Sequence, residues 1–305
     1  MNAARNLGNS YNNLSTSVAR LSSGMRINSA ADDAAGLAIR EMMRTDIRVL
    51  NQGVRNANDA ISLIQTADGA LSVVDEKLTR MKELAEQAAT GTYTSAQRLI
   101  MDSGYQAMAT EISRIAMATD FNGVKLLDGS LSGTAVGGGP GNQMKIHFGT
   151  GNISAGDYYY IRIGNSTASA LGLGNSASPT HAGYTISTQS ADQAALEAID
   201  VAVQSKDTIR ASLGAISNRL SNTISNLSIQ AQNLQAAESR ISDVDVASEM
   251  TEFTRNQILV QAAVAMLAQA NSLPQMPLQL INGRSAEVRW IGKEEAVHAE
   301  GQQLS

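Results

Sequence analysis

The stretch RLSSGMRINSAADDAAGLAIR, residues 20–40, decides how the chain is organised. Ser-Ser-Gly at 22–24 interrupts one amphipathic helical pattern, and Asn-Ser-Ala-Ala-Asp-Asp at 28–33 has the polar character of the start of a second helix. With Ser29 as the N-cap, Asp32 and Asp33 would lie in the first helical turn, where negative charge favours the helix dipole. The sequence therefore predicts a joint between two helices close to the start of the chain.

Helices at the two ends of the chain are expected to pair with each other. The first carries apolar side chains at the heptad spacing that is typical of helices lying along one another. A matching run follows a polar break at 239–245, and Pro274 should end it. The first series is Leu7, Tyr11, Leu14, Val18, Leu21 and Met25, and the second is Met250, Phe253, Val260, Val264, Leu267 and Asn271.

A further apolar series predicts one long helix over residues 34–89. At about 1.5 Å per residue this helix would be roughly 80 Å long, and its apolar stripe needs a partner. Gly53 and Gly69 should each weaken it by up to about 1 kcal/mol relative to Ala. The series needs a one-residue slip after Ile64, which a helix can absorb by a local change of winding. Its members are Met43, Ile47, Leu50, Val54, Ala57, Ile61 and Ile64, then Ala67, Leu71, Val74, Leu78, Met81 and Ala85.

The segments after the long helix predict a turn, a second helix and then a small β-rich insert. Thr90-Gly91-Thr92 should end the long helix, with Gly91 suited to a left-handed cap. Thr94-Ser95-Ala96-Gln97 offers a capping box for a helix that ends near Thr119. Asn122-Gly123 then indicates a turn that enters a strand.

The rest of the chain completes a mainly α fold. Alternating side chains at 144–148 and an extended run at 158–163 predict short antiparallel strands, and GGGPG at 137–141 indicates a turn or loop. Helical periodicity returns at Ala191. The expected fold is a long antiparallel helical rod or coiled coil, formed by the N- and C-terminal segments, with a small β-hairpin insert.

Composition argues against several classes of function. The 28 Asp and Glu residues outnumber 23 Lys and Arg, so the net charge of −5 does not suit a nucleic-acid binder. The chain has no cysteine, and no run approaches the roughly 18 apolar residues of a membrane span. His147, His181 and His298 lie in separate segments without metal-ligand spacing. We therefore expect neither an enzyme nor a metal or cofactor site.

Several motifs, taken in order along the chain, resemble those of bacterial flagellins, the subunits of the flagellar filament. The resemblance implies a terminal helical domain from 1–30 and 244–282, and a rod domain from 31–128 and 191–243. Residues 129–190 would supply the β-hairpin part of the rod with a minimal variable region. The tail 283–305 matches nothing in the family, and it is predicted to be disordered and to hinder assembly. At the other end, members of the family carry an apolar, Asn-rich segment before the position that corresponds to Met1. The motifs are LSSGMRINSAADDAAGLAIR (21–40), NDAISLIQTADGALSVVDEKLTRMKELAEQAATGT (58–92), TDFNGVKLL (119–127), ASALGL (168–173), RASLGAISNRLSNTISNL (210–227), AAESRISDVDVASEM (236–250) and AVAMLAQANSLPQM (263–276).

The resemblance also implies the function and the partners. The chain would be a secreted structural protein that assembles with copies of itself into the extracellular flagellar filament, for swimming motility. A flagellar export chaperone and a cap protein would be further partners. Alternatives are a hook–filament junction protein, which shares the terminal helices, or another secreted helical interaction protein such as a translocator or an adhesin stalk. The residues expected in the assembly seam are Leu7, Leu14, Leu21, Phe253, Val260 and Leu267.

One surface set is implied by the resemblance alone. In flagellins sensed by animal hosts, the Arg and Leu of the stretch matching RMKEL, residues 80–84, bind Toll-like receptor 5. A Glu ahead of the Phe-Asn-Gly turn joins them, which is Glu111 here. Arg80 and Leu84 share a helix face at i and i+4, and Lys82 and Glu83 lie between them. The same face could instead pack against the neighbouring subunit of a filament.

Overall fold

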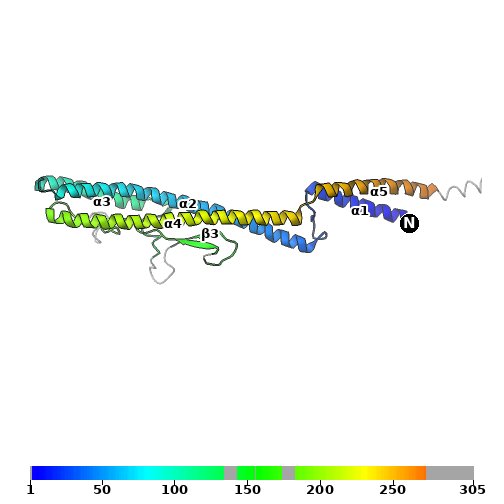
Figure 1. The fold of residues 1–305 in the computed structure, drawn as a ribbon, viewed down its shortest axis with the longest axis horizontal. Helices are drawn as coiled ribbons and strands as arrows, with labels where there is room; N and C mark the ends of the chain where they lie inside the picture. Colours follow the sequence, from blue (N-terminus) through cyan, green and yellow to red (C-terminus); the bar gives the residue numbers. More distant parts are fainter. Residues whose placement is uncertain (1, 134–142, 155, 174–182, 273–305) are drawn as a thin grey trace, which may run out of the picture. The chain divides into compact units, whose positions relative to one another are not determined.

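The computed structural model describes residues 2–133, 143–154, 156–173 and 183–272, and in this part of the chain it confirms the mainly α fold with a small β-hairpin insert (Figure 1). The turn expected at 137–141, Pro274 and the tail 283–305 lie outside the described residues. The elements are α1 (Asn2–Ser23), α2 (Ala34–Ala89), α3 (Ser95–Ala118), β1 (Asp120–Phe121), β2 (Val124–Lys125), β3 (Met144–His147), β4 (Tyr158–Ile161), α4 (Gln189–Ser242) and α5 (Val246–Ser272).

The chain divides into two compact units, which are described separately. The terminal unit comprises the described residues of Met1–Met42 and Ala237–Ser305, and the rod unit comprises those of Met43–Ala236. In the terminal unit α1 and α5 lie side by side, as Figure 1 shows. The end of α1 meets the start of α5, where Arg20 pairs with Glu249 at 3.7 Å, so the two helices are antiparallel.

The rod unit packs α3 and α4 along α2 (Figure 1). The first of its apolar clusters joins α2, α3 and α4 around side chains such as Leu78, Ile112 and Ile199. A second cluster brings the β-hairpin segments onto α2 and α4, with Leu126, Leu127 and Ile161 wholly buried. The insert is therefore part of the rod's core and not an appendage.

The buried stripe of α2 is a continuous heptad, which corrects the predicted slip. Val54 and Ile61 are only partly buried, whereas Gly53 and Ala60 occupy the seam. With these two small residues included, the steps alternate between three and four along the helix and no change of phase is needed. The seam consists of Leu50, Gly53, Ala57, Ala60, Ile64, Ala67, Leu71, Val74, Leu78, Met81, Ala85 and Ala88.

The capping box at Thr94 and the turn at Asn122-Gly123 are confirmed, whereas the predicted left-handed cap at Gly91 is wrong. Gly91 does not have a positive φ, and the Arg98 side chain instead bonds the carbonyl oxygens of Ala88 and Thr90 at the end of α2. The Thr94 hydroxyl accepts the amide of Gln97, and the Gln97 side chain accepts the amide of Thr94 at 2.9 Å, which completes the capping box. Asn122 and Gly123 both have positive φ, 52° and 80°, as a type I′ turn between β1 and β2 requires. Strand β4, the antiparallel partner of β3, ends at Ile161 rather than at 163.

The joint between α1 and α2 differs from the prediction in its cap. Helix α2 begins at Ala34, and Asp33 caps it: its carboxylate accepts the amide of Gly36 at 2.8 Å, and its carbonyl oxygen accepts the amide of Leu37 at 3.0 Å. Ser29 is therefore not the N-cap. Residues 29–32 instead form a turn ahead of the helix, in which the Asp32 amide donates to the Ser29 carbonyl oxygen at 3.1 Å. The second joint is also shorter than predicted, because α4 continues through Ser242.

Candidate assembly and recognition surfaces

The seam between α1 and α5 contains all six residues expected there, at part-buried or buried positions. The other members of the stripe are small or polar residues, in place of the larger apolar residues that were predicted. Tyr11 and Val18 are 51% and 48% exposed, and Met250, Val264 and Asn271 are also exposed, so the prediction that these five residues lie in the seam is wrong. The observed stripe is Leu7, Ser10, Leu14, Ser17 and Leu21 on α1, with Phe253, Asn256, Val260, Ala263 and Leu267 on α5.

Small residues explain which of the two possible stripes faces the partner. Heptad spacing fits two sets of positions on α1, which are 7, 11, 14 and 18 or 7, 10, 14 and 17. The second set contains Ser10 and Ser17. Ser17 is almost completely buried. A small side chain lets the two helix backbones approach closely, whereas Tyr11 in that place would hold them apart. The packing therefore leaves the larger apolar side chains outside.

Large apolar side chains are consequently exposed on the outer surface of this helix pair, among polar ones. Large apolar residues with substantial exposure occur on both helices, and a shallow groove on α5 is lined by Met250, Ile258, Leu259 and the side chains around them. Exposed apolar surface of this kind marks an interaction site in a folded protein. The exposed residues are Tyr11 and Val18 on α1, with Val246, Met250, Ile258, Leu259, Val264 and Met266 on α5.

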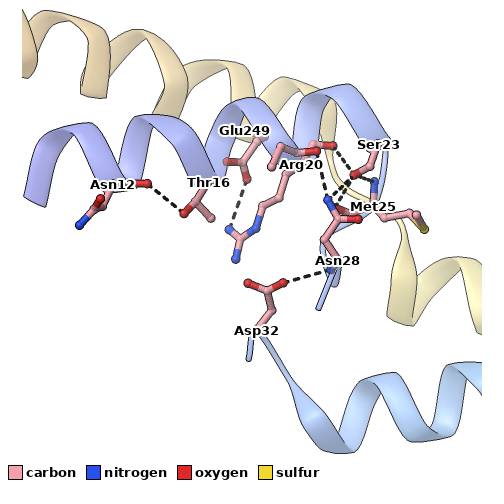
Figure 2. A network of polar contacts seen from close by, with 9 residues as sticks. Asn12, Thr16, Arg20, Ser23, Met25, Asn28, Asp32 and Glu249 are labelled. Atoms are coloured by element: carbon pink, nitrogen blue, oxygen red, sulfur yellow. Dashed lines mark hydrogen bonds and ion pairs between the residues drawn. The ribbon is translucent and has the colours of Figure 1, made fainter. Parts of the chain in front are cut away.

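A polar network holds the segment that follows α1, as Figure 2 shows. The Asn28 amide side chain donates to the Ala19 carbonyl oxygen at 3.2 Å and to the Ser23 hydroxyl at 2.9 Å. The Asp32 carboxylate accepts the backbone amides of Asn28 and Ser29, at 3.1 and 2.9 Å. These bonds, with the charge of Arg20, lower the pKa of Asp32. The segment is thus an ordered turn and not a loose linker.

Backbone contacts bring the two joints of the terminal unit together. Met25 and Asp243 form an antiparallel bridge, with the Arg26 amide donating to the Ser242 carbonyl oxygen at 2.7 Å. Arg40 is buried, and its guanidinium donates to the carbonyl oxygen of Ile27 at 2.7 Å. The break after α1 and the break before α5 therefore form a single structural feature, as the matching joints in the sequence suggested.

The structure places the receptor-type residues on α2 and α3 of the rod unit. Arg80 is exposed and pairs with Glu83 at 2.5 Å, whereas Lys82 reaches across to Asp200 of α4 at 2.5 Å. Glu111 is bound by Arg114 through two bonds, at 2.6 and 2.8 Å. Each charged residue of the set is thus already engaged in the monomer.

Leu84 departs from the expectation of a surface anchor. It is half-buried and packs against the core cluster of α2, α3 and α4. A Cβ atom added at Gly104 of α3 would lie 3.6 Å from it. The bond from Arg114, together with the charges of Arg114 and Lys77, lowers the pKa of Glu111. Leu84 therefore borders the α2–α3 contact, and Arg80 is more exposed.

The described residues contain neither a candidate metal site nor a candidate membrane span. No group of three or more His, Asp and Glu side chains in those ranges could hold a metal ion. A search of the same ranges also finds no helix long and apolar enough to cross a membrane.

Comparisons with known proteins bear on the family. A model of the bacterial flagellin N-terminal helical region matches residues 1–132, and one of the C-terminal helical region matches residues 196–281. A flagellin of Halalkalibacterium halodurans is 44% identical over 281 residues, which cover 92% of this chain and 96% of that protein. The chain belongs to the flagellin family. A flagellin of Bacillus subtilis is 46% identical over 86% of this chain and 90% of that protein.

A solved structure extends the comparison to the fold alone. A flagellar hook-associated protein from Vibrio parahaemolyticus matches with a TM-score of 0.54 over 70% of this chain and the whole of that chain, at 17% identity. Other members of the flagellin family among the relatives carry the name of flagellar filament core proteins, one from Treponema maltophilum at 39% identity. The family assignment rests on the sequence relatives, and the structural match agrees with its helical architecture.

Sequence reasoning missed the small and polar members of the seams. On α1 and α5 these are Ser10, Ser17, Asn256 and Ala263. The signal that could have found them is their own seven-residue repeat, since Ser10 and Ser17 recur at that spacing, as do Asn256 and Ala263. A search for apolar bulk passes over such positions.

Proposed function

We propose that this flagellin-family chain is a secreted structural subunit that assembles with copies of itself into the extracellular flagellar filament and so serves swimming motility. The observation that carries this proposal is the set of large exposed apolar side chains on the α1–α5 pair, most of them on α5, in a chain of this family. Relatives named as filament core proteins agree with it. A flagellar export chaperone and a cap protein are the further partners implied.

The terminal unit exposes apolar side chains that other subunits could cover in an assembly. A two-helix pair buries little apolar area by itself, which limits its stability. Ile258 and Met266 are 59% and 66% exposed on α5. Packing several such pairs together would remove these side chains from water, at about 25 cal/mol per Å² of apolar area. Assembly would thus supply an apolar partner that the described residues of the isolated chain do not provide.

Seeded polymerisation tests the proposal. Purified chain mixed with short filament fragments should elongate them above a critical concentration, as seen by light scattering and electron microscopy. Ile258→Asp should raise that concentration by at least tenfold, because a charge would have to be buried. Ile229→Asp, a change at a similarly exposed Ile on α4, controls for added charge. A chain that stays monomeric with seeds, or forms only short closed oligomers, would favour a junction protein or another helical interaction protein.

Hydrogen exchange tests the same idea in a different way. Amides of residues 7–21 should exchange quickly in dilute monomer and become protected in the polymer, because the outer surface of the pair is then covered. Amides in the middle of α2, within the rod unit, should be protected in both states. Strong protection of residues 7–21 in the dilute monomer would contradict the proposal.

We further propose that the rod surface around Arg80, Leu84 and Glu111 binds Toll-like receptor 5. The family resemblance of RMKEL at 80–84 supports this. Arg80 is the most exposed of the three, Leu84 packs half-buried against the core of α2, α3 and α4, and Glu111 is bound by Arg114 on α3. Lys82 and Glu83 would contribute charge at its edge. The receptor would have to compete with the Arg80–Glu83 and Arg114–Glu111 ion pairs, which limits the binding free energy gained from each new contact.

Charge reversal at Arg80 is the decisive experiment for receptor binding. Arg80→Asp removes a charge and places a carboxylate beside Glu83, so binding of the monomer to the receptor ectodomain should weaken by more than tenfold. Arg255→Asp is the matched control, because Arg255 is similarly exposed and pairs with Glu252 at the same spacing. Unchanged binding by Arg80→Asp would refute the assignment.

Truncation of Leu84 needs a second readout. Leu84→Ala should reduce binding by about 1–2 kcal/mol if the side chain is an anchor. Because Leu84 is half-buried, the same change should also lower the melting temperature of the rod unit. Binding is therefore compared at a temperature where both proteins are folded. A lower melting temperature with unchanged binding would make Leu84 a core residue only.

A further inference from the structure

The start of α4 contains a buried carboxyl group that neither proposed surface uses. Asp192 is 0% exposed, and neither of its carboxylate oxygens has a hydrogen-bond partner among the described residues. Its backbone amide is bonded to the carbonyl oxygen of Thr188 at 3.0 Å, so the helix holds it in place. A charge in this position loses its hydration without receiving donors in exchange. The environment therefore penalises the charged form of Asp192.

The nearest favourable charge is already engaged elsewhere. Arg98 of α3 attracts a carboxylate at Asp192, but its Nε donates to the Ala88 carbonyl oxygen at 2.9 Å. Its Nη2 donates to the Thr90 carbonyl oxygen at 3.1 Å. Through these bonds Arg98 caps the last turn of α2. It can lower the energy of an ionised Asp192 from a distance, without forming a bond that would keep the carboxylate buried.

The amide dipoles in the first turn of α4 favour a negative charge at Asp192, but the other side chains that face this position do not. Asp102 of α3 has the same sign as an ionised Asp192, and its carboxylate accepts the amide of Ile186 at 2.8 Å. The Tyr105 hydroxyl is buried without a partner among the described residues, and burial, with Asp102 and Tyr184 nearby, raises its pKa. Tyr105 therefore stays neutral at physiological pH. Burial, opposed by Arg98 and reinforced by Asp102, raises the pKa of Asp192.

We propose that Asp192 is a proton-controlled latch on the first turn of α4. As a neutral acid it stays in the core, on the same helix face as Ala195 and Ile199. When it loses its proton, the first turn opens so that the carboxylate reaches water, and the segment before α4 loosens from α3. The rest of α4 remains packed, so the opening is local.

The direction of the pH dependence follows from the two states. The closed state has the higher pKa, and the open state has the ordinary carboxyl value of 3.8. The latch is therefore fully closed below that value and weakens as the pH rises toward the closed-state pKa. Above the closed-state pKa the opening constant should be level. Between the two values it should increase by up to tenfold per pH unit.

Hydrogen exchange of amides 193–196, which donate to the carbonyl oxygens of the first turn, tests the latch in the full-length monomer, with rates corrected for the intrinsic pH dependence. The parent should show the rise in opening constant, and Asp192→Asn, which has nearly the same shape and no charge, should show a level profile. Asp200→Asn is the control, because Asp200 is exposed and pairs with Lys82; it should follow the parent. A level profile in the parent, or the same rise in Asp192→Asn, would overturn the proposal.

A second measurement keeps the test decisive if Asp192→Asn does not fold. Infrared spectra of the parent should contain a protonated carboxylic-acid band that titrates at higher pH than the band of the other acids. Its loss in parallel with the opening of α4 would support the latch. A single acid band that disappears with the exposed carboxyls would refute it.

Discussion

Replacing Gly53 with Ala should destabilise the rod unit, whereas the same change at Gly69, on the same helix, should stabilise it. In an unobstructed helix interior, Ala is favoured over Gly by about 1 kcal/mol. A Cβ atom at Gly69 would have nothing within 4 Å among the described residues, so Gly69→Ala should show that gain. A Cβ at Gly53 would overlap the carbonyl oxygen of Phe148 and lie 2.8 and 2.9 Å from its carbonyl carbon and Cα.

The clash at Gly53 is with backbone, which cannot rotate away as a side chain can. Phe148 is 2% exposed and packs with Leu50 and Leu227, so displacing it would also disturb that cluster. Overpacking of this kind costs about 1–3 kcal/mol. After subtraction of the helix-propensity gain, Gly53→Ala should be destabilised by up to about 2 kcal/mol. Gly69→Ala should be stabilised by about 0.5–1 kcal/mol.

Urea unfolding of the two variants, followed by circular dichroism in dilute monomer, measures both effects. In a unit of this size, about 1 kcal/mol corresponds to a shift of about 2–4 °C in melting temperature, so calorimetry can check the result. The decisive quantity is the difference between the two variants, since any general effect of Ala on helix formation is common to both. Equal stabilisation by Gly53→Ala and Gly69→Ala would refute the close approach of Phe148 to α2.

Three further changes test other parts of the structure. The backbone amides of Ile153 and Gly151 donate to the Asp157 carboxylate and lower its pKa. The stabilising effect of Asp157 is therefore present at neutral pH and is lost as the pH falls through the folded-state pKa. Asp157→Ala should lower the melting temperature at pH 7 and have less effect in acid, which calorimetry at several pH values would show. Thr94→Ala removes the N-cap of α3 and should cost about 1 kcal/mol in urea unfolding. Arg40→Met leaves a buried carbonyl oxygen unsatisfied in the terminal unit, and hydrogen exchange there should reveal a loss of about 1–3 kcal/mol.

Local patterns in the sequence determined the elements of this fold. The long helix was predicted over 34–89 and spans Ala34–Ala89, because heptad spacing and the absence of proline are properties of the segment itself. The capping box at Thr94 and the turn at Asn122-Gly123 were likewise predicted, since their bonds join residues at most three apart. The pairing of the terminal helices was predicted too, from matching heptads at the two ends.

Only the tertiary structure decided which stripe of each helix is buried. On α1 and on α2, two sets of positions one residue apart both satisfy the heptad, and apolar bulk favoured the set with Tyr11 or Val54. The observed seams contain Ser17 and Gly53 instead, because the separation of the packed backbones selects small residues. That separation depends on the partner, such as the Phe148 backbone against Gly53, which is distant in sequence. The same limit applies to the burial of Asp192, where the surrounding groups come from other segments and set the energy of a charge.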